Sequence, residues 1–192
     1  DQFLAKVCKA YMALIGDGRG GVFCENTLER MATWSEVMQQ KIKPGGFDVV
    51  LTNPPFGKKI VVKGEPLLSQ FDLGYKWKYE KTAKQWERTS TLRDKLPPQI
   101  PFLERCVQLL KPGGRLGIVL PESIFGNPSH QFIISWLTQR LQITAIASMP
   151  EALFKTSGKG GTHTKVCILV GTKKQADERF DIFMGEAKWC GH

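Results

Sequence analysis

The feature that most constrains this chain is a short apolar run that ends in two consecutive prolines, within residues 48–57. The run Val49, Val50 and Leu51 is too short for a helix and rich in β-branched residues, so it predicts a buried strand. Each proline restricts the backbone and removes an N–H donor, so the chain must leave the sheet after Asn53. Asn53 is then expected at the carboxyl end of a strand, where open α/β sheets bind their ligands.

The residues of this turn have a specific chemical use. The side-chain carbonyl of Asn53 and the backbone carbonyl of Pro54 can accept both N–H bonds of an exocyclic amine. These bonds draw the nitrogen toward tetrahedral geometry and leave its lone pair directed at an incoming methyl group. Pro55 stiffens the loop, and Phe56 can stack on a base taken out of its duplex. The pattern predicts amine methylation; the alternative is a plain Pro-Pro turn followed by a core Phe.

The rest of the chain alternates between the helical and the strand period. Helices are expected at residues 1–15, 34–42, 101–110 and from 128 or 129 to 141, and strands at residues 22–24, 48–53, 116–121, 143–149, 165–170 and 179–184. This alternation, with Gly and Pro between the elements, predicts an α/β fold with a doubly wound, Rossmann-like and mostly parallel sheet. The last two strands have a short connection, so we expect them to pair antiparallel.

Composition limits the class of protein further. A chain of 192 residues fits one domain, and it has no run of about 18 apolar residues that would predict a membrane span. The five cysteines show no zinc-site spacing, so we expect no metal and a reduced, cytosolic compartment. Cys24 and Cys167 lie in apolar runs and are predicted to be small core residues. The net charge of +9 favours a polyanionic partner.

Residues 57–97 interrupt the alternation with a basic, aromatic insertion. It carries ten Lys or Arg against five Asp or Glu, a net +5 of the chain's +9. Four aromatic rings alternate with these cations, those of Tyr75, Trp77, Tyr79 and Trp86. Two interpretations stay open at this point. The insertion is either a nucleic-acid-binding surface or a solvated helix-and-loop excursion whose Trp side chains pack on the body of the protein.

The turn at Asn53 resembles the Asn-Pro-Pro-Phe signature of amino-methyltransferases that use S-adenosylmethionine, above all the N6-adenine DNA methyltransferases. Further stretches are similar, in the same order, to the M (modification) subunits of type I restriction systems. These stretches are residues 24–28, 101–104, 111–116, 119–123 and 160–169. The resemblance covers nearly the whole chain except the basic insertion.

The resemblance implies a role for particular residues. The catalytic residues would be Asn53, Pro54, Pro55 and Phe56, and the cofactor S-adenosylmethionine would be bound by Asn26, Asn53 and Phe102. The substrate would contact Phe56, Thr162, Thr164 and Lys165. The implied partners are DNA, a separate specificity subunit and a restriction subunit, in the cytoplasm of a prokaryote.

The sequence departs from the family in one respect. The Gly-rich loop that binds the methionine end of the cofactor is absent, and so is the acidic residue that holds the ribose. We therefore expect residues 1–192 to be the C-terminal catalytic part of one methyltransferase domain, inactive and weak in cofactor binding by itself. The alternatives are methylation of RNA bases or of a protein glutamine, or a catalytically silent DNA-binding or assembly subunit.

Overall fold

The computed structural model describes residues 1–18, 20–57, 60–154, 164–176 and 180–189, in two compact units, Asp1–Lys43 and Pro44–His192. The helices of the first unit are α1 (Gln2–Leu14) and α2 (Glu36–Lys41). Those of the second are α3 (Glu65–Leu68), α4 (Gln99–Leu109), α5 (Ser123–Gly126) and α6 (Gln131–Arg140). The strands are β1 (Phe47–Thr52), β2 (Val62–Lys63), β3 (Tyr75–Glu80), β4 (Gln85–Leu92), β5 (Lys95–Leu96), β6 (Leu110–Pro121), β7 (Leu141–Ser148), β8 (Val166–Lys173) and β9 (Phe183–Glu186).

The first unit confirms two predicted helices but not the predicted strand. Helix α1 begins at Asp1, whose carboxylate accepts the N–H groups of Phe3 and Leu4 at 2.8 and 3.3 Å. Residues 22–24 are not a strand, and Cys24 is exposed rather than in a core. A strand needs a neighbour to pair with, and the described part of this unit contains no strand.

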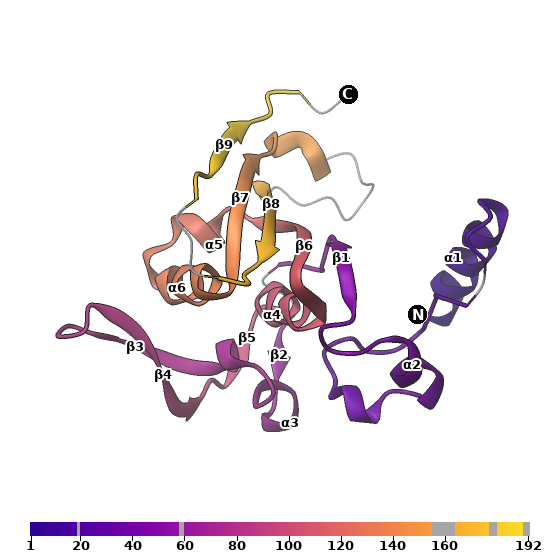
Figure 1. Cartoon of the computed structure of the whole chain (residues 1–192), viewed down its shortest axis with the longest axis horizontal. Coiled ribbons are helices and arrows are strands. Elements are labelled where there is room, and N and C mark those ends of the chain that lie inside the picture. Colours follow the sequence, from indigo (N-terminus) through magenta and orange to yellow (C-terminus); the bar gives the residue numbers. More distant parts are fainter. Residues whose placement is uncertain (19, 58–59, 155–163, 177–179, 190–192) are drawn as a thin grey trace. The chain divides into compact units, whose positions relative to one another are not determined.

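The second unit is built on a five-stranded sheet with the order β1-β6-β8-β7-β9 (Figure 1). Strands β1 and β6 are parallel, as are β7 and β9, while β8 is antiparallel to both of its neighbours. The helical connections α4 and α5–α6 carry the chain from β1 to β6 and from β6 to β7. The predicted α/β class with one late antiparallel strand is confirmed.

The pairing predicted for the last two strands is wrong. Strand β9 pairs in parallel with β7, whereas β8 lies between β6 and β7. The physical reason is that both edges of β8 are already hydrogen-bonded, so β9 cannot pair with β8 and joins the sheet at the free edge of β7. The strand predicted at residues 179–184 begins at Phe183 and ends at Glu186; residues 177–179 lie outside the described residues.

The two faces of the sheet differ. Alternate residues of β6 (Leu116, Ile118 and Leu120) are buried on the face that packs against helices α4 and α6. On the other face Val49 and Leu51 of β1 and Val170 of β8 are exposed, Leu51 to 77%. The prediction that this strand is buried is therefore wrong within this unit, because β1 is an edge strand with one open face. Since successive residues of a strand point to opposite faces, one face is core and the other is open within this unit.

Helix α4 ends where Lys173 of β8 binds its last turn. The Lys173 ammonium donates to the backbone carbonyls of Val107 and Leu110, at 2.8 and 2.7 Å. A cation is favourable at a helix C-terminus because the last carbonyls have no partner within the helix. The helix ends at Leu109, before Pro112, and β6 begins directly at Leu110.

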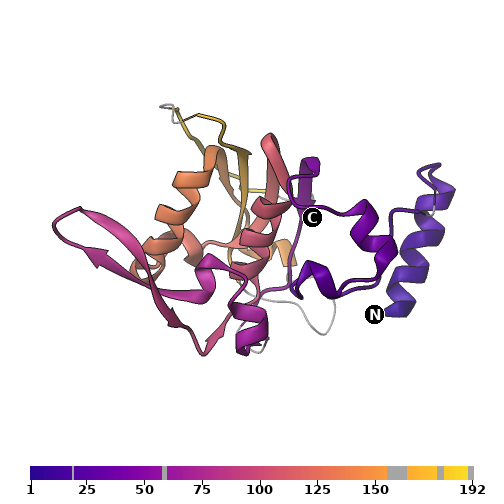
Figure 2. The same ribbon diagram turned by 60° about the horizontal axis from the view of Figure 1, so that its bottom comes forward.

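The described part of the insertion at 57–97 is mainly β structure, with the short helix α3 between β2 and β3. Strands β2 and β5 pair antiparallel at its base, and β3 and β4 form a long antiparallel hairpin. The hairpin extends away from the central sheet in both ribbon views (Figures 1 and 2). Among the residues that the structure describes, no helix is long and apolar enough to cross a membrane.

Candidate active site

The Asn-Pro-Pro-Phe turn lies at the carboxyl edge of the sheet, as the sequence predicts. Strand β1 ends at Thr52, and Asn53 follows with its side chain exposed, while Pro54 is buried. Because β1 and β6 are parallel, both end at this edge, and the antiparallel strand β8 begins there. The turn thus holds the Asn53 amide in solvent while Pro54 anchors the loop to the protein.

Asn53 lines an open groove of about 640 Å³ over the exposed face of the sheet. We call it the open-face groove; it is lined by Val49, Leu51, Thr52 and Asn53, by Arg115, Leu116, Gly117, Ile118 and Val119 of β6, and by Ile168 and Val170 of β8. Gly117 shapes its floor, since a Cβ there would lie 2.6 Å from the Cδ2 atom of Leu51. The groove is mainly apolar, and Asn53 brings an amide to its end.

Phe56 is half-buried and contacts a second aromatic ring. Its ring centroid lies 5.9 Å from that of Phe154, with an angle of 62° between the two planes. Phe154 ends a short 3-10 helix, Glu151–Phe154, that follows β7. The sequence analysis did not single out Phe154. Its position after the strand at 143–149 was the available signal, but a single Phe in such a loop carries little weight alone.

A charged cluster lies at the same edge. Glu122 directly follows β6, and its carboxylate accepts a hydrogen bond from the Ser148 hydroxyl and pairs with Lys165 at 3.5 Å. Lys165 also lies 3.6 Å from a carboxylate oxygen of Glu186. The predicted substrate residues Thr164 and Lys165 are therefore at the edge that carries Asn53, but the Lys165 ammonium is held by two acids. Glu122 and Glu186 were not predicted as site residues.

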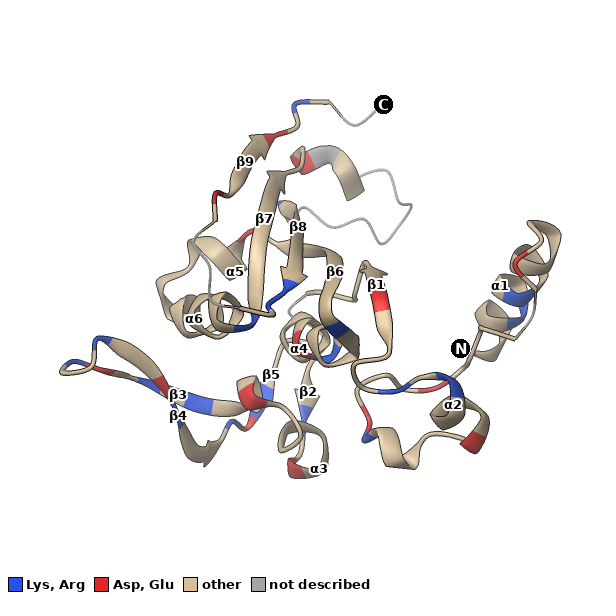
Figure 3. Cartoon of the chain, viewed as in Figure 1, with Lys and Arg blue, Asp and Glu red and all other residues tan. Residues whose placement is uncertain are grey.

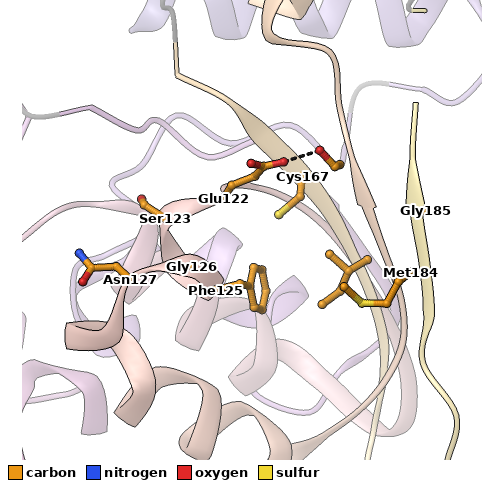
Figure 4. A pocket seen from close by; sticks show the side chains of 10 residues that line it. Glu122, Ser123, Phe125, Gly126, Asn127, Cys167, Met184 and Gly185 are labelled. Carbon is orange, nitrogen blue, oxygen red and sulfur yellow. Dashed lines mark hydrogen bonds between the residues drawn. The ribbon is translucent and has the colours of Figure 1, made fainter. Parts of the chain in front are cut away.

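A second cavity of about 620 Å³ lies on the opposite face of the sheet, beside α5 (Figure 4). Its lining residues are Glu122, Ser123, Phe125, Gly126, Asn127, Ile146, Ser148, Cys167, Met184 and Gly185. Burial, and to a smaller extent the charge of Glu122, raises the pKa of the Cys167 thiol to about 11. The thiol is therefore neutral near pH 7, and it is not an activated nucleophile. The predicted burial of Cys167 is confirmed.

The remaining predicted residues are not placed in the open-face groove. Asn26 belongs to the first unit, where its Oδ1 accepts the Leu28 N–H at 3.1 Å and its backbone carbonyl accepts the Trp34 indole N–H. Phe102 is half-buried in helix α4. Thr162 lies outside the described residues. Within the described part of the chain, no group of three or more His, Cys, Asp or Glu side chains could hold a metal ion.

Comparison with known proteins places the chain in a family. The N-6 DNA Methylase family matches residues 5–190, so this protein belongs to that family. A curated relative, the type II methyltransferase M.XhoI of Xanthomonas vasicola, is 34% identical over 94 residues. That match covers 47% of this chain and 14% of the relative, so the chain spans a small part of the relative's length.

Solved structures with low sequence identity share the fold. The type ISP restriction-modification enzyme LlaGI, in a nuclease-deletion form with a DNA substrate mimic, matches with a TM-score of 0.58 at 14% identity, over 93% of this chain and 19% of that one. The related enzyme LlaBIII, bound to DNA, matches with a TM-score of 0.57 at 15% identity, over 89% and 13%. A Listeria monocytogenes protein described as a class I S-adenosylmethionine-dependent methyltransferase matches with 0.54 at 20% identity, over 73% and 36%.

Proposed function

We propose that this chain is the catalytic part of an enzyme that transfers a methyl group from S-adenosylmethionine to the N6 amine of adenine in DNA. The observation that carries the proposal is the exposed Asn53 amide at the carboxyl end of β1, followed by a buried proline and an aromatic ring. Membership of the N-6 DNA Methylase family supports the same reaction. The fold is also that of proteins described as methyltransferases and restriction-modification enzymes.

The residues at this edge can activate a weakly nucleophilic amine. The Asn53 Oδ1 atom and the Pro54 carbonyl oxygen would each accept one N–H of the adenine amine, which leaves its lone pair free. Phe56 would stack on the adenine ring after the base leaves the duplex. The nitrogen gains positive charge as it is methylated, so its proton becomes acidic and requires no dedicated His or Glu base. Catalysis would rest on positioning and on carbonyl dipoles.

S-adenosylmethionine would supply the methyl group when it is bound. The donor set present fits it in part: Asn53 offers an amide at the end of the apolar open-face groove, and Phe102 offers an aromatic ring on α4. The Asn26 amide oxygen is already engaged in a local turn. We therefore propose Asn53 and Phe102 as cofactor contacts within the second unit, and the role of Asn26 stays a prediction from the sequence.

The same proposal extends to the setting of the enzyme. We propose that the whole protein works in a prokaryotic restriction-modification system, in the cytoplasm, beside a specificity subunit and a restriction subunit. The resemblance to LlaGI and LlaBIII, which are named restriction-modification enzymes, supports the system as a whole. The individual subunits rest on the resemblance of the motifs alone.

Replacing Asn53 by Ala in the full-length protein tests the function. We expect the methylation rate of adenine-containing duplex DNA to fall by roughly 10²–10³-fold, the loss seen when one charge-stabilising hydrogen-bond partner is removed. DNA affinity should stay within a few-fold, because the only part of the DNA that the amide would contact is the target amine. The matched control is Gln139→Ala, which removes an exposed amide from α6.

The same assay separates the alternatives. Equal or faster methylation of an RNA of the same sequence, or of a glutamine-containing peptide, would replace DNA as the substrate. A full-length protein that methylates none of these substrates before the Asn53 change, yet binds DNA, would be a silent DNA-binding or assembly subunit. Unchanged methylation in Asn53→Ala would refute the proposed role of the Asn-Pro-Pro-Phe turn.

A further inference from the structure

The β3–β4 hairpin is a ribbon with two chemically different sides. Tyr75, Trp77 and Tyr79 of β3 alternate with Lys76 and Lys78, so they point to opposite sides of the ribbon. The register sets Trp77 opposite Arg88 and Tyr79 opposite Trp86 on the first side, and Lys78 opposite Glu87 on the second. The first side therefore carries the aromatic rings together with Arg88, and the second side carries lysines and Glu87.

The aromatic side packs against helix α6. The Trp77 ring stacks on Phe132 with centroids 6.2 Å apart, and the Trp86 ring lies 6.3 Å from the same Phe132 centroid. The guanidinium of Arg93 lies 4.5 Å from that centroid on the same buried ring. Phe132 is only 4% exposed. These Trp rings are thus used in packing against Phe132, and both residues are half-buried.

The root of the hairpin is tied to the body of the unit through Asp72. Its carboxylate accepts from the Arg140 guanidinium at 2.8 Å and from the Trp136 indole at 3.3 Å, and it lies 3.6 Å from Arg88. Its backbone N–H donates to the buried Glu104 carboxylate at 2.7 Å. Helices α4 and α6 therefore both hold Asp72, which lies three residues before the first residue of β3. The ribbon is anchored at its root and along its aromatic side.

The opposite side and the turn present lysines to solvent. Lys76 and Lys78 on β3 and Lys81 and Lys84 in the turn are all exposed, the Lys78 side chain to 62%. Two acids lie among them: Glu80, 3.8 Å from Lys78, and Glu87. Four cations against two anions leave this surface positive, and Lys and Arg recur along the ribbon (Figure 3).

We propose that these four lysines, Lys76, Lys78, Lys81 and Lys84, form a phosphate-binding arm that contacts duplex DNA outside the target base. The inference rests on the proposed function and adds where the duplex would be held. Lysines on a ribbon whose Trp rings pack against α6 suit backbone phosphates and read no sequence. The arm would thus contribute affinity, while the recognition of a site would have to come from elsewhere.

The test is the salt dependence of DNA affinity in the full-length protein. We compare two fourfold variants for binding to duplex DNA at several salt concentrations. The arm variant combines Lys76→Ala, Lys78→Ala, Lys81→Ala and Lys84→Ala. The charge-matched control combines Lys6→Ala, Lys9→Ala, Lys43→Ala and Lys188→Ala. Each lost phosphate contact lowers the slope of log K against log salt by about 1. In the arm variant we expect the magnitude of this slope to fall by roughly 2–4 and the DNA affinity at low salt to fall by at least about tenfold. The control should change little in either quantity.

For a second variant we expect the opposite effect, a gain in DNA affinity. Glu80→Gln with Glu87→Gln removes the two acids from the arm and should raise DNA affinity and steepen the slope. Because it removes repulsion rather than contacts, it keeps the proposal testable even if the fourfold lysine variant unfolds. Equal slopes in the arm variant and its control, together with no gain in the Gln variant, would overturn the arm. So would loss of binding to an acidic protein subunit with DNA affinity intact, since the arm would then serve a protein.

Methylation measured at saturating DNA distinguishes failure of the proposed phosphate-binding arm from failure of the proposed function. If both proposals hold, the arm variant methylates at nearly the normal rate once DNA is saturating, whereas Asn53→Ala does not. If the DNA slope changes in the arm variant while the unmodified protein methylates no DNA, the arm stands and the proposed function fails.

Discussion

Aromatic rings lie beside polar groups in two regions of this protein, the Asn-Pro-Pro-Phe turn and the β3–β4 hairpin, and the two regions use them differently. In the turn, Phe56 is half-buried at the end of a strand, next to an exposed amide. In the hairpin, Trp77 and Trp86 cover the ring of Phe132 and expose the lysines of the other side. Aromatic rings therefore serve packing in the hairpin, whereas in the turn we propose that Phe56 stacks on a base.

The largest expected effect tests the packing role of the hairpin aromatics. Phe132→Ala should lower the free energy of unfolding of the protein by about 3–5 kcal/mol, since a buried Phe is removed from beneath two Trp rings. Urea or thermal unfolding measures this loss. The matched control is Tyr79→Ala, where the ring is 48% exposed, and it should cost less than about 1 kcal/mol. A loss of similar size in both variants would mean that the hairpin does not pack as described.

The next effect concerns the anchor of the hairpin and depends on pH. Burial raises the pKa of Glu104 to about 7, although the backbone N–H groups of Leu73 and Asp72 oppose this shift. A carboxyl whose pKa is higher in the folded protein stabilises it most below the ordinary pKa, and that contribution is lost as pH rises toward 7. The free energy of unfolding should therefore fall by about 3 kcal/mol between pH 4.5 and pH 8, since one pKa unit is worth about 1.4 kcal/mol.

Glu104→Gln should remove this part of the pH dependence. The amide cannot titrate, although it leaves one of the two N–H groups at 2.7 and 2.9 Å without a good acceptor. The measured quantity is the slope of unfolding free energy with pH, because its level also contains the lost hydrogen bond. Glu25→Gln, at an exposed position of the first unit, is the charge-matched control and should keep the slope. A slope that persists in Glu104→Gln would assign the pH dependence to other groups.

The smallest expected effect tests the aromatic ring of the Asn-Pro-Pro-Phe turn. Phe56→Ala should reduce methylation efficiency (kcat/KM) in the full-length protein by about 5- to 150-fold, which corresponds to 1–3 kcal/mol of lost base stacking. Its cost in unfolding free energy should be smaller than that of Phe132→Ala, because Phe56 is only half-buried. Phe56→Ala should therefore act mainly on methylation, and Phe132→Ala mainly on stability. If Phe56→Ala leaves kcat/KM unchanged, the ring does not contact the base.

Much of the local structure was predictable because its causes are local. The strand that ends at Asn53 follows from a short β-branched run before two prolines, and helices α1, α4 and α6 follow from apolar groups at the helical period. The predicted burial of Cys167 was correct, but that of Cys24 was not. The same apolar pattern surrounds both, and only Cys167 lies in a strand whose neighbours cover it.

The sequence by itself determined where the chain must turn and which groups the turn presents, because proline restricts the backbone wherever it occurs. The tertiary structure decided which strand β9 joins, which side of the hairpin is buried and which acids hold Lys165. Those outcomes depend on contacts between residues far apart in the chain. No local pattern specifies them, because they depend on which sheet edges, faces and charged groups the rest of the fold brings together.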